Sequence, residues 1–147
     1  TALERIMTSE SRFASRGDDS GTHKAELRIW ELLGEPPEPR DDRWYLETGS
    51  GMGATLNVAV GLRAYTMTDR ATWLRFANQG TFEILFENDP VMFNQYGLVK
   101  LNPDHCPNVN VTDSDVFANW LLGPDGQTAI ASHQVAGQQL FFPNASP

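Results

Sequence analysis

The sequence has 147 residues, of which 40% are hydrophobic and 10% aromatic, so it is long and apolar enough to build its own core. Its formal net charge is -8, and an acidic chain lacks the broad positive surface that binding to nucleic acid or to an anionic membrane needs. The single cysteine, Cys106, cannot form an internal disulfide, and no Cys/His spacing of a zinc site occurs. These totals exclude nucleic acid as an expected partner, and any anion must bind at a local site.

The first half of the chain reads as alternating helices and strands. Apolar residues recur with helical spacing in 22–34, where Leu27, Trp30 and Leu33 share one face. The segment 43–49 is compatible with a helical turn or a strand, and both readings stay open. The other elements expected here are helices over 1–9, 49–64 and 70–80, the last with Asp69 as its cap, and strands over 12–15 and 64–69.

The second half continues with two strands and two helices. Strands are expected over 82–88 and 96–102, where β-branched and aromatic residues gather. Helices are expected over 112–123, with Thr112 as the cap, and over 124–134. The alternation along the whole chain predicts an α/β protein with a mixed sheet flanked by helices, rather than a helix bundle or a β-sandwich.

A donor-rich turn precedes the helix expected over 22–34, where residues 15–23 read SRGDDSGTH. The start of a helix leaves backbone N–H groups without internal partners and carries partial positive charge, so it suits an anion. Gly21 lets a ligand approach the backbone, and Ser20 and Thr22 add hydroxyl donors. Arg16 adds a guanidinium that matches the geometry of an oxyanion.

The same residues also have a simpler interpretation, and the sequence alone does not decide between the two. Ser20 can act only as a helix cap, and Arg16 can pair with Asp18 or Asp19. A second glycine-rich turn, GSGMGATL over 49–56, also leads into a helix. Two such turns facing one cavity would surround a tetrahedral anion. The glycine spacing of the second turn matches neither a dinucleotide-binding nor a phosphate-loop motif.

Several blocks of the sequence resemble, in order, the tungstate-binding proteins of ABC uptake systems. They read SRGDDSGTHKAEL, WYLETGSGMGATLNVA, AYTMTDRATWL, DPVMFNQYGLVKLNP, and FANWLLGPDGQTAI followed by GQQLFFPNA. The similarity runs over nearly the whole chain. Because these proteins are type II periplasmic solute-binding proteins, the resemblance implies a two-lobed α/β fold with the ligand in a cleft between the lobes.

The resemblance also implies a ligand and a set of ligand-binding residues. The pattern R-x-x-x-S-G-T is similar to the anion-contacting segment of phosphate-binding proteins with the same fold. The expected ligand is tungstate or molybdate, held by hydrogen bonds as an intact oxyanion, with no catalytic residue, resident metal or cofactor. A phosphate- or sulfate-type anion is the alternative. The implied ligand-binding residues are Arg16, Ser20, Gly21, Thr22, Met52, Gly53 and Thr68.

Compared with that family, the chain matches the second lobe and the C-terminal return to the first lobe. The resemblance implies an oxyanion-binding segment over 1–95 and a returning segment over 96–147. Family members carry a further N-terminal segment with a Thr/Ser-rich motif, and this sequence shows no such motif. We therefore expect an incomplete first lobe, whose exposed face would favour a homodimer. The resemblance also implies an ABC permease as membrane partner and a periplasmic or extracytoplasmic location, although no signal peptide opens the sequence.

Two other classes of function compete with anion binding. An enzyme would need a nucleophile and a base, and Ser20 and His23 are candidates, but the sequence has no nucleophile-elbow motif. His23 is therefore expected at the surface or behind the ligand contacts. An interaction module, derived from the binding-protein fold, is suggested by the RGD tripeptide at 16–18, a match short enough to arise by chance.

The remaining prominent side chains receive structural roles. Glu26, Arg28 and Glu31 are expected on a solvated helix face. The tryptophans are expected to pack in the core: Trp30, Trp44, Trp73 and Trp120.

Overall fold

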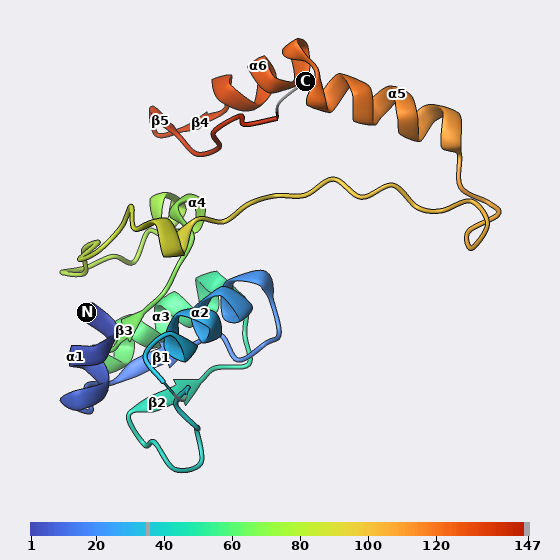
Figure 1. Cartoon of the computed structure of the whole chain (residues 1–147). Coiled ribbons are helices and arrows are strands. Elements are labelled where there is room, and N and C mark those ends of the chain that lie inside the picture. Colours follow the sequence, from blue (N-terminus) through green and yellow to red (C-terminus); the bar gives the residue numbers. More distant parts are fainter. Residues whose placement is uncertain (35, 146–147) are drawn as a thin grey trace. The chain divides into compact units, whose positions relative to one another are not determined.

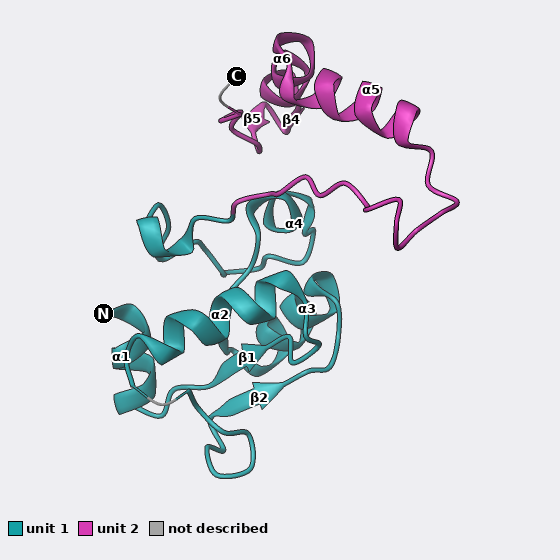
Figure 2. Ribbon diagram, turned by 45° about the vertical axis from the view of Figure 1, so that its right-hand side comes forward, with its two compact units in different colours: residues 1–94 teal, residues 95–147 magenta. Residues whose placement is uncertain are grey.

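A three-stranded parallel sheet lies at the centre of the first of two units into which the chain divides (Figures 1 and 2). The computed structural model describes residues 1–34 and 36–145. The first unit is Thr1–Asn94, and the second begins at Gln95. The elements of the first unit are α1 (Ala2–Thr8), β1 (Phe13–Ser15), α2 (Gly21–Glu31), β2 (Tyr45–Glu47), α3 (Met52–Leu62), β3 (Tyr65–Thr66), α4 (Arg70–Arg75) and the 3-10 turn η1 (Pro90–Met92).

The strand order of this sheet is β2-β1-β3, so β1 is the central strand. Phe13 of β1 is in register with Tyr45 of β2 on one side and with Tyr65 of β3 on the other. Parallel neighbours need a crossover connection, and α2 and α3 supply the two crossovers. Each of these helices therefore begins just after the carboxyl end of a strand, at the same edge of the sheet.

The core of the first unit is an aromatic cluster between α2 and the sheet. Trp30 of α2 is fully buried, and its ring meets Phe13 edge-on at 5.4 Å between centroids. Tyr45 stacks on Phe13 at 5.9 Å and also meets Trp30 edge-on at 6.3 Å. Burying each such side chain contributes about 1.5–3 kcal/mol. A second, smaller cluster of buried alanines, Ala14, Ala59 and Ala64, includes residues of α3 and β1.

The second unit contains two helices and a hairpin: α5 (Val111–Leu122), α6 (Pro124–Ser132), β4 (Gln134–Val135) and β5 (Gln138–Gln139). The two strands are antiparallel, and the Ala136–Gly137 turn between them has positive φ at both residues, as a tight hairpin requires. The cap of α5 differs from the prediction. Asn110, rather than Thr112, accepts the bond from the Asp113 N–H at 3.1 Å.

The structure confirms the α/β class and changes several boundaries. The three-stranded sheet is parallel throughout, and the antiparallel pair is confined to the second unit. The segment 43–49 contains a strand, β2, and the helix expected over 70–80 ends at Arg75. Among the described residues, no helix has the length and apolar character that crossing a membrane needs.

The predicted strands over 82–88 and 96–102 are wrong. Both segments are outside any helix or strand, and side chains such as Leu85 and Val99 are exposed. An apolar pattern favours a strand, but a strand also needs a neighbour that accepts and donates its backbone hydrogen bonds. No described residue pairs with either segment as a neighbouring strand.

Two of the tryptophans predicted to pack in the core do so. Trp30 and Trp44 are buried, whereas Trp73 is half-buried. Trp120 is 47% exposed, although it stacks on Phe117 one turn earlier in α5. Its predicted core role is therefore wrong, because that face of α5 remains open.

Candidate functional site

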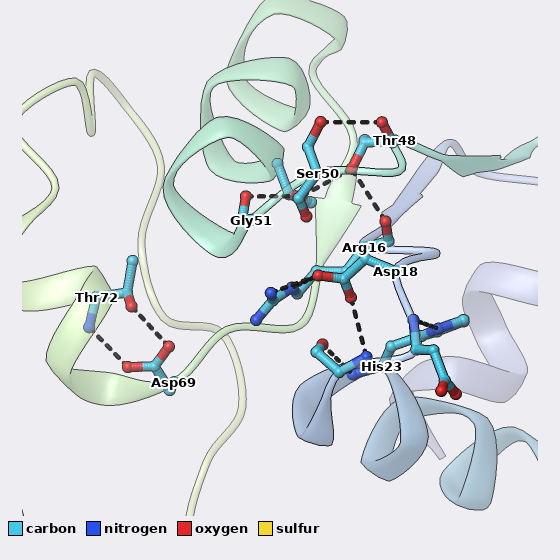
Figure 3. Close-up of polar contacts among 11 residues, drawn as sticks. Arg16, Asp18, His23, Thr48, Ser50, Gly51, Asp69 and Thr72 are labelled. Atoms are coloured by element: carbon cyan, nitrogen blue, oxygen red, sulfur yellow. Dashed lines mark hydrogen bonds and ion pairs between the residues drawn. The ribbon is translucent and has the colours of Figure 1, made fainter.

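Two loops that follow β1 and β2 lie at one edge of the sheet and are joined by hydrogen bonds. We call residues 16–20 the first loop and residues 48–51 the second loop. The backbone N–H of Ser50 and the hydroxyl of Thr48 donate to the carbonyl of Arg16, at 3.2 and 3.4 Å (Figure 3). The loop that precedes α2 is thus tied to the loop that precedes α3. In open α/β sheets this edge is where ligands bind.

Arg16 supplies positive charge at the first loop, and its side chain is only 17% exposed. Its Nη2 and Nε lie 2.5 and 3.1 Å from Oδ2 of Asp18, while Oδ1 of Asp18 accepts the Ser20 N–H at 3.2 Å. Hydrogen bonds from Ser20, and then from Arg16, lower the pKa of Asp18 to about 2. The pairing expected as the simpler interpretation is therefore present. Within the described residues Nη1 of Arg16 donates no hydrogen bond, so the guanidinium keeps a free edge.

Asp19, the second aspartate of the first loop, faces solvent. Its side chain is 86% exposed, and its Oδ2 lies 3.2 Å from Nζ of Lys24. Its backbone has a positive φ of 58°. Neither aspartate therefore offers a free, sheltered carboxylate at the sheet edge.

The start of α2 presents several donors. Ser20 is the N-cap, and its Oγ accepts the His23 N–H at 3.3 Å. In the described part of the chain, the N–H groups of Gly21 and Thr22 and the Thr22 hydroxyl donate no hydrogen bond. The space that a Cβ on Gly21 would occupy is empty to 4 Å. A ligand can therefore reach these amides.

The start of α3 presents backbone donors only. Its N-cap is Gly51, which has no side chain to accept a capping hydrogen bond. The side chain of Met52 is 6% exposed, so it belongs to the core and only its backbone can serve a ligand. Gly53 has open space on its outer side.

The fully buried side chain of Thr55 stabilises the second loop through hydrogen bonds. Its Oγ1 lies 2.8 Å from Oγ1 of Thr48 and 3.2 Å from the carbonyls of Ser50 and Gly51. Thr48 also donates its N–H to the Ser15 carbonyl at 2.9 Å. The buried hydroxyl thus ties the start of α3 to Thr48, whose own N–H bonds to the end of β1.

Thr68 is turned toward its own neighbour. Its hydroxyl donates to the carbonyl of Asp69 at 3.2 Å. Asp69 caps α4 as predicted, because its carboxylate accepts the N–H and hydroxyl of Thr72 at 2.8 and 2.6 Å (Figure 3). Thr68 makes no hydrogen bond to either loop. Arg16 and Ser20 are part of the first loop, so Thr68 is less closely connected to the site than they are.

Glu26 is a buried residue that the sequence interpretation placed wrongly on a solvated face. It is 1% exposed. Its Oε1 accepts from the Tyr45 hydroxyl at 2.7 Å and from Trp30 Nε1 at 3.2 Å, and its Oε2 accepts from the Ser15 hydroxyl at 2.9 Å. Burial raises the pKa of Glu26. The signal that was missed is the i, i+4 spacing of Glu26 and Trp30, which puts both on the inner face of α2.

His23 lies behind the first loop, which is one of the two positions expected for it. It is 8% exposed, and its Nδ1 accepts the backbone N–H of Asp19 at 3.1 Å (Figure 3). The Ser20 Oγ contacts the backbone of His23 rather than its ring. These two residues therefore do not form a nucleophile–base pair. Across residues 1–34 and 36–145, no group of three or more His, Cys, Asp and Glu is placed to hold a metal ion.

A family model described as a PBP superfamily domain matches residues 2–125. The chain belongs to the PBP superfamily. A curated relative, the tungstate-binding protein TupA of Peptoclostridium acidaminophilum, is 40% identical over 147 residues, covering 99% of this chain and 50% of the relative. The solved tungstate-binding protein TupA from Desulfovibrio alaskensis G20 is 41% identical with a TM-score of 0.82, covering 99% of this chain and 59% of that one.

A second solved structure, described as the tungstate ABC transporter from Geobacter sulfurreducens, is 38% identical with a TM-score of 0.75. The match covers 90% of this PBP-superfamily chain and 55% of the Geobacter chain. The similarity to tungstate-binding proteins that the sequence blocks predict is therefore confirmed. The PBP-superfamily chain spans about half the length of the curated relatives it matches, with 50%, 43% and 54% of each covered.

Proposed function

We propose that this chain is the oxyanion-binding part of a solute-binding protein of an ABC uptake system, with tungstate or molybdate as its ligand. The observation that carries the proposal is the joining of the two loops at the Arg16 carbonyl, which gathers free donors at one sheet edge. The relatives named for tungstate binding cover nearly all of the chain, and so include both loops.

The ligand contacts in this proposal come from hydrogen-bond donors. Arg16 supplies charge through the free edge of its guanidinium, and the start of α2 supplies the Ser20 and Thr22 hydroxyls and the amides of Gly21 and Thr22. The start of α3 supplies the amides of Met52 and Gly53, also unbonded within the described residues. Thr68 joins the set if its hydroxyl turns from the Asp69 carbonyl to the anion.

The same geometry favours an oxyanion that carries no proton. A protonated anion such as hydrogen phosphate needs an acceptor for its O–H. Asp18 has both carboxylate oxygens engaged, and Asp19 faces solvent beside Lys24. We therefore expect oxyanions that carry no proton, such as tungstate, molybdate and sulfate, to be preferred over phosphate, with cavity size selecting among them.

The proposed activity is binding without chemical change. Ser20 and His23 are not paired as nucleophile and base, and the relatives are named as binding proteins. By the same relationship we propose an extracytoplasmic location and a membrane permease of the ABC type as partner.

We also propose that the second unit, from Gln95 onward, belongs to the other lobe of a two-lobed protein. The relatives extend well beyond the matched region, and apolar side chains of this unit, including Trp120 and Val99, are exposed. The rest of the two-lobed protein, or a second copy of the chain in a homodimer, would cover them. Sedimentation equilibrium with and without tungstate distinguishes a monomer from a dimer.

Titration calorimetry tests the proposed ligand. The chain is titrated with tungstate, molybdate, sulfate and phosphate at one pH, alone and fused to the remaining part of the Desulfovibrio alaskensis protein. We expect tungstate or molybdate to bind tightly at least in the fused form, with phosphate inert. Preference for phosphate would overturn the assignment of an unprotonated oxyanion, and no binding in either form would overturn the site.

A matched pair of variants tests whether the measured anion occupies this site. Arg16→Ala removes a charge-assisted contact and should weaken binding about 10- to 100-fold. Arg40→Ala removes the same charge from an exposed loop and should leave affinity unchanged. Equal losses in both variants would show that only the net charge matters.

A further inference from the structure

His23 contacts the first loop through one ring nitrogen. Its Nδ1 accepts the backbone N–H of Asp19 at 3.1 Å. A nitrogen that accepts a hydrogen bond carries no proton, so the ring proton of the neutral imidazole sits on Nε2. The side chain of His23 is only 11% exposed, so water does not readily replace this bond.

The bond to Nδ1 fixes an unfavourable turn of the backbone. Asp19 has φ of 58° and Gly17 has φ of 57°. A left-handed conformation is unfavourable for a residue other than glycine. The Asp19 N–H bond to His23 helps to offset that cost and keeps Ser20 where its N–H reaches Asp18. The position of the donors at the start of α2 therefore depends on His23.

The other side of the ring faces β2. Nε2 has no hydrogen-bond partner among the described residues, and Oε1 of Glu47 lies 3.7 Å away. Glu47 also packs closely against the first loop: a Cβ added to Gly17 would lie only 2.5 Å from the Cβ of Glu47. The ring is thus held between Glu47 and the loop.

The charged groups near His23 come from three elements. Glu47 approaches from β2, Asp18 and Asp19 belong to the first loop, and Glu26 lies one turn along α2. Arg16 and Lys24 are paired with Asp18 and Asp19, respectively. Protonation would place a hydrogen on Nδ1 directly opposite the Asp19 N–H. Two donors cannot bond to each other, so the contact that holds the loop would be lost.

We propose that His23 is a positioning residue whose neutral imidazole holds the first loop in its anion-binding form, so that protonating this ring releases the loop and lowers oxyanion affinity. This inference rests on the proposed function of the two loops. His23 itself touches no ligand in it. The expected consequence is tighter anion binding at neutral pH than in mild acid.

Two variants separate the ring nitrogens. In His23→Asn the amide oxygen can stand where Nδ1 stands and accept the Asp19 N–H at every pH. In His23→Gln the amide lies farther out, in the place of Nε2, and the loop loses its acceptor. Affinity for tungstate is measured by calorimetry from pH 8 to pH 5.5, at concentrations that keep the anion monomeric, with sulfate as a ligand that stays unprotonated.

The wild-type chain should lose about tenfold in affinity for both anions over this range, since one hydrogen bond contributes on the order of tenfold. His23→Asn should bind like wild type at pH 8 and show a flat profile. His23→Gln should bind about tenfold more weakly at pH 8. A pH profile that persists in His23→Asn, or a His23→Gln variant that matches wild type, would overturn the proposal.

An NMR measurement without anion keeps this test separate from the proposed function. The ¹⁵N shifts of the ring should report a proton on Nε2 and none on Nδ1, and the Asp19 amide resonance should move with the same midpoint as the ring. If these hold while no anion binds, the proposed ligand fails but the loop contact stands. If the Asp19 amide does not follow the ring, His23 does not hold the loop.

Discussion

The carbonyl of Arg16 accepts the backbone N–H of Ser50 at 3.2 Å, which links the end of β1 to the loop that opens α3. A residue that supplies a guanidinium through its side chain therefore also joins the two loops through its backbone. The positions of the two sets of helix-start amides are coupled by this bond. Substitutions that loosen either loop should then affect both stability and anion affinity.

Thr55→Val is expected to destabilise the fold and to weaken oxyanion binding. The buried hydroxyl contacts Thr48 and the carbonyls of Ser50 and Gly51, and valine replaces it with a methyl group. Losing a buried hydroxyl that is hydrogen-bonded costs about 1–3 kcal/mol. Urea unfolding measures the loss, and Thr55→Ser, which keeps the hydroxyl, is the control. Equal stability of the valine and serine variants would mean that the hydroxyl does not brace the second loop.

Gly17→Ala should destabilise the first loop by at least about 1–2 kcal/mol. Its φ of 57° is strained for alanine, and the added Cβ would lie 2.5 Å from the Cβ of Glu47. Gly61→Ala provides a matched control, because it lies in α3 with open space around it and should stabilise by about 0.5–1 kcal/mol. Thermal unfolding of both variants checks the opposite signs. An alanine at 17 that leaves stability unchanged would show that the loop can shift away from Glu47.

The sequence was sufficient to predict the elements whose signals are local. Helical spacing located α2, and glycine-rich turns located the starts of α2 and α3. Asp69 was identified as a cap from its position before a helical run. In each case the deciding interactions lie within a few residues, so the sequence contains them.

Features that depend on distant partners were not predictable in the same way. The spacing with Trp30 can place Glu26 on the inner face of α2, but its role as an acceptor depends on Tyr45 and Ser15, which come from two different strands. The segments 82–88 and 96–102 read as strands, yet strand formation depends on a neighbour that no described residue supplies. The competing roles of Arg16, as anion contact or as partner of Asp18, also needed three-dimensional positions.

Glu26→Gln is expected to remove a pH dependence of stability. Burial raises the folded-state pKa of Glu26 above its ordinary value of 4.5, so the folded chain binds more protons than the unfolded chain above that pH. Stability should therefore fall as pH rises from 4.5 through the raised pKa, and the glutamine variant should lack this fall. The free energy of unfolding is measured with urea from pH 4.5 to 7.5 for both proteins. The difference between wild type and Glu26→Gln at each pH isolates the effect.

Glu26→Leu serves as the control for that series. Leucine leaves the Ser15, Trp30 and Tyr45 donors buried without an acceptor and should cost about 2 kcal/mol or more at every pH. Glutamine keeps an acceptor for two of them and can donate to Ser15. If the pH dependence of the glutamine variant matched wild type, another group would be responsible for it.

Asp18→Asn should reduce the loss of stability in strong acid. The pKa of Asp18 is lowered from 3.8 to about 2 in the folded chain. The stability that this carboxylate contributes is complete above 3.8 and disappears as pH falls toward 2. Acid unfolding followed by circular dichroism should show a shallower decline between pH 4 and 2 in the asparagine variant. A decline as steep as that of wild type would mean that other carboxylates dominate acid unfolding.

Arg16→Ala should cost more oxyanion affinity than Asp18→Ala. Removing Arg16 deletes the positive charge at the site, whereas removing Asp18 releases the guanidinium from its partner and leaves the charge in place. The Asp18 variant should still lose some affinity, because the carboxylate orients Arg16 and accepts the Ser20 N–H. Calorimetry with tungstate and sulfate ranks the two variants at pH 7.5. A larger loss in Asp18→Ala would place the carboxylate itself against the ligand, and binding should then shift toward anions that carry a proton.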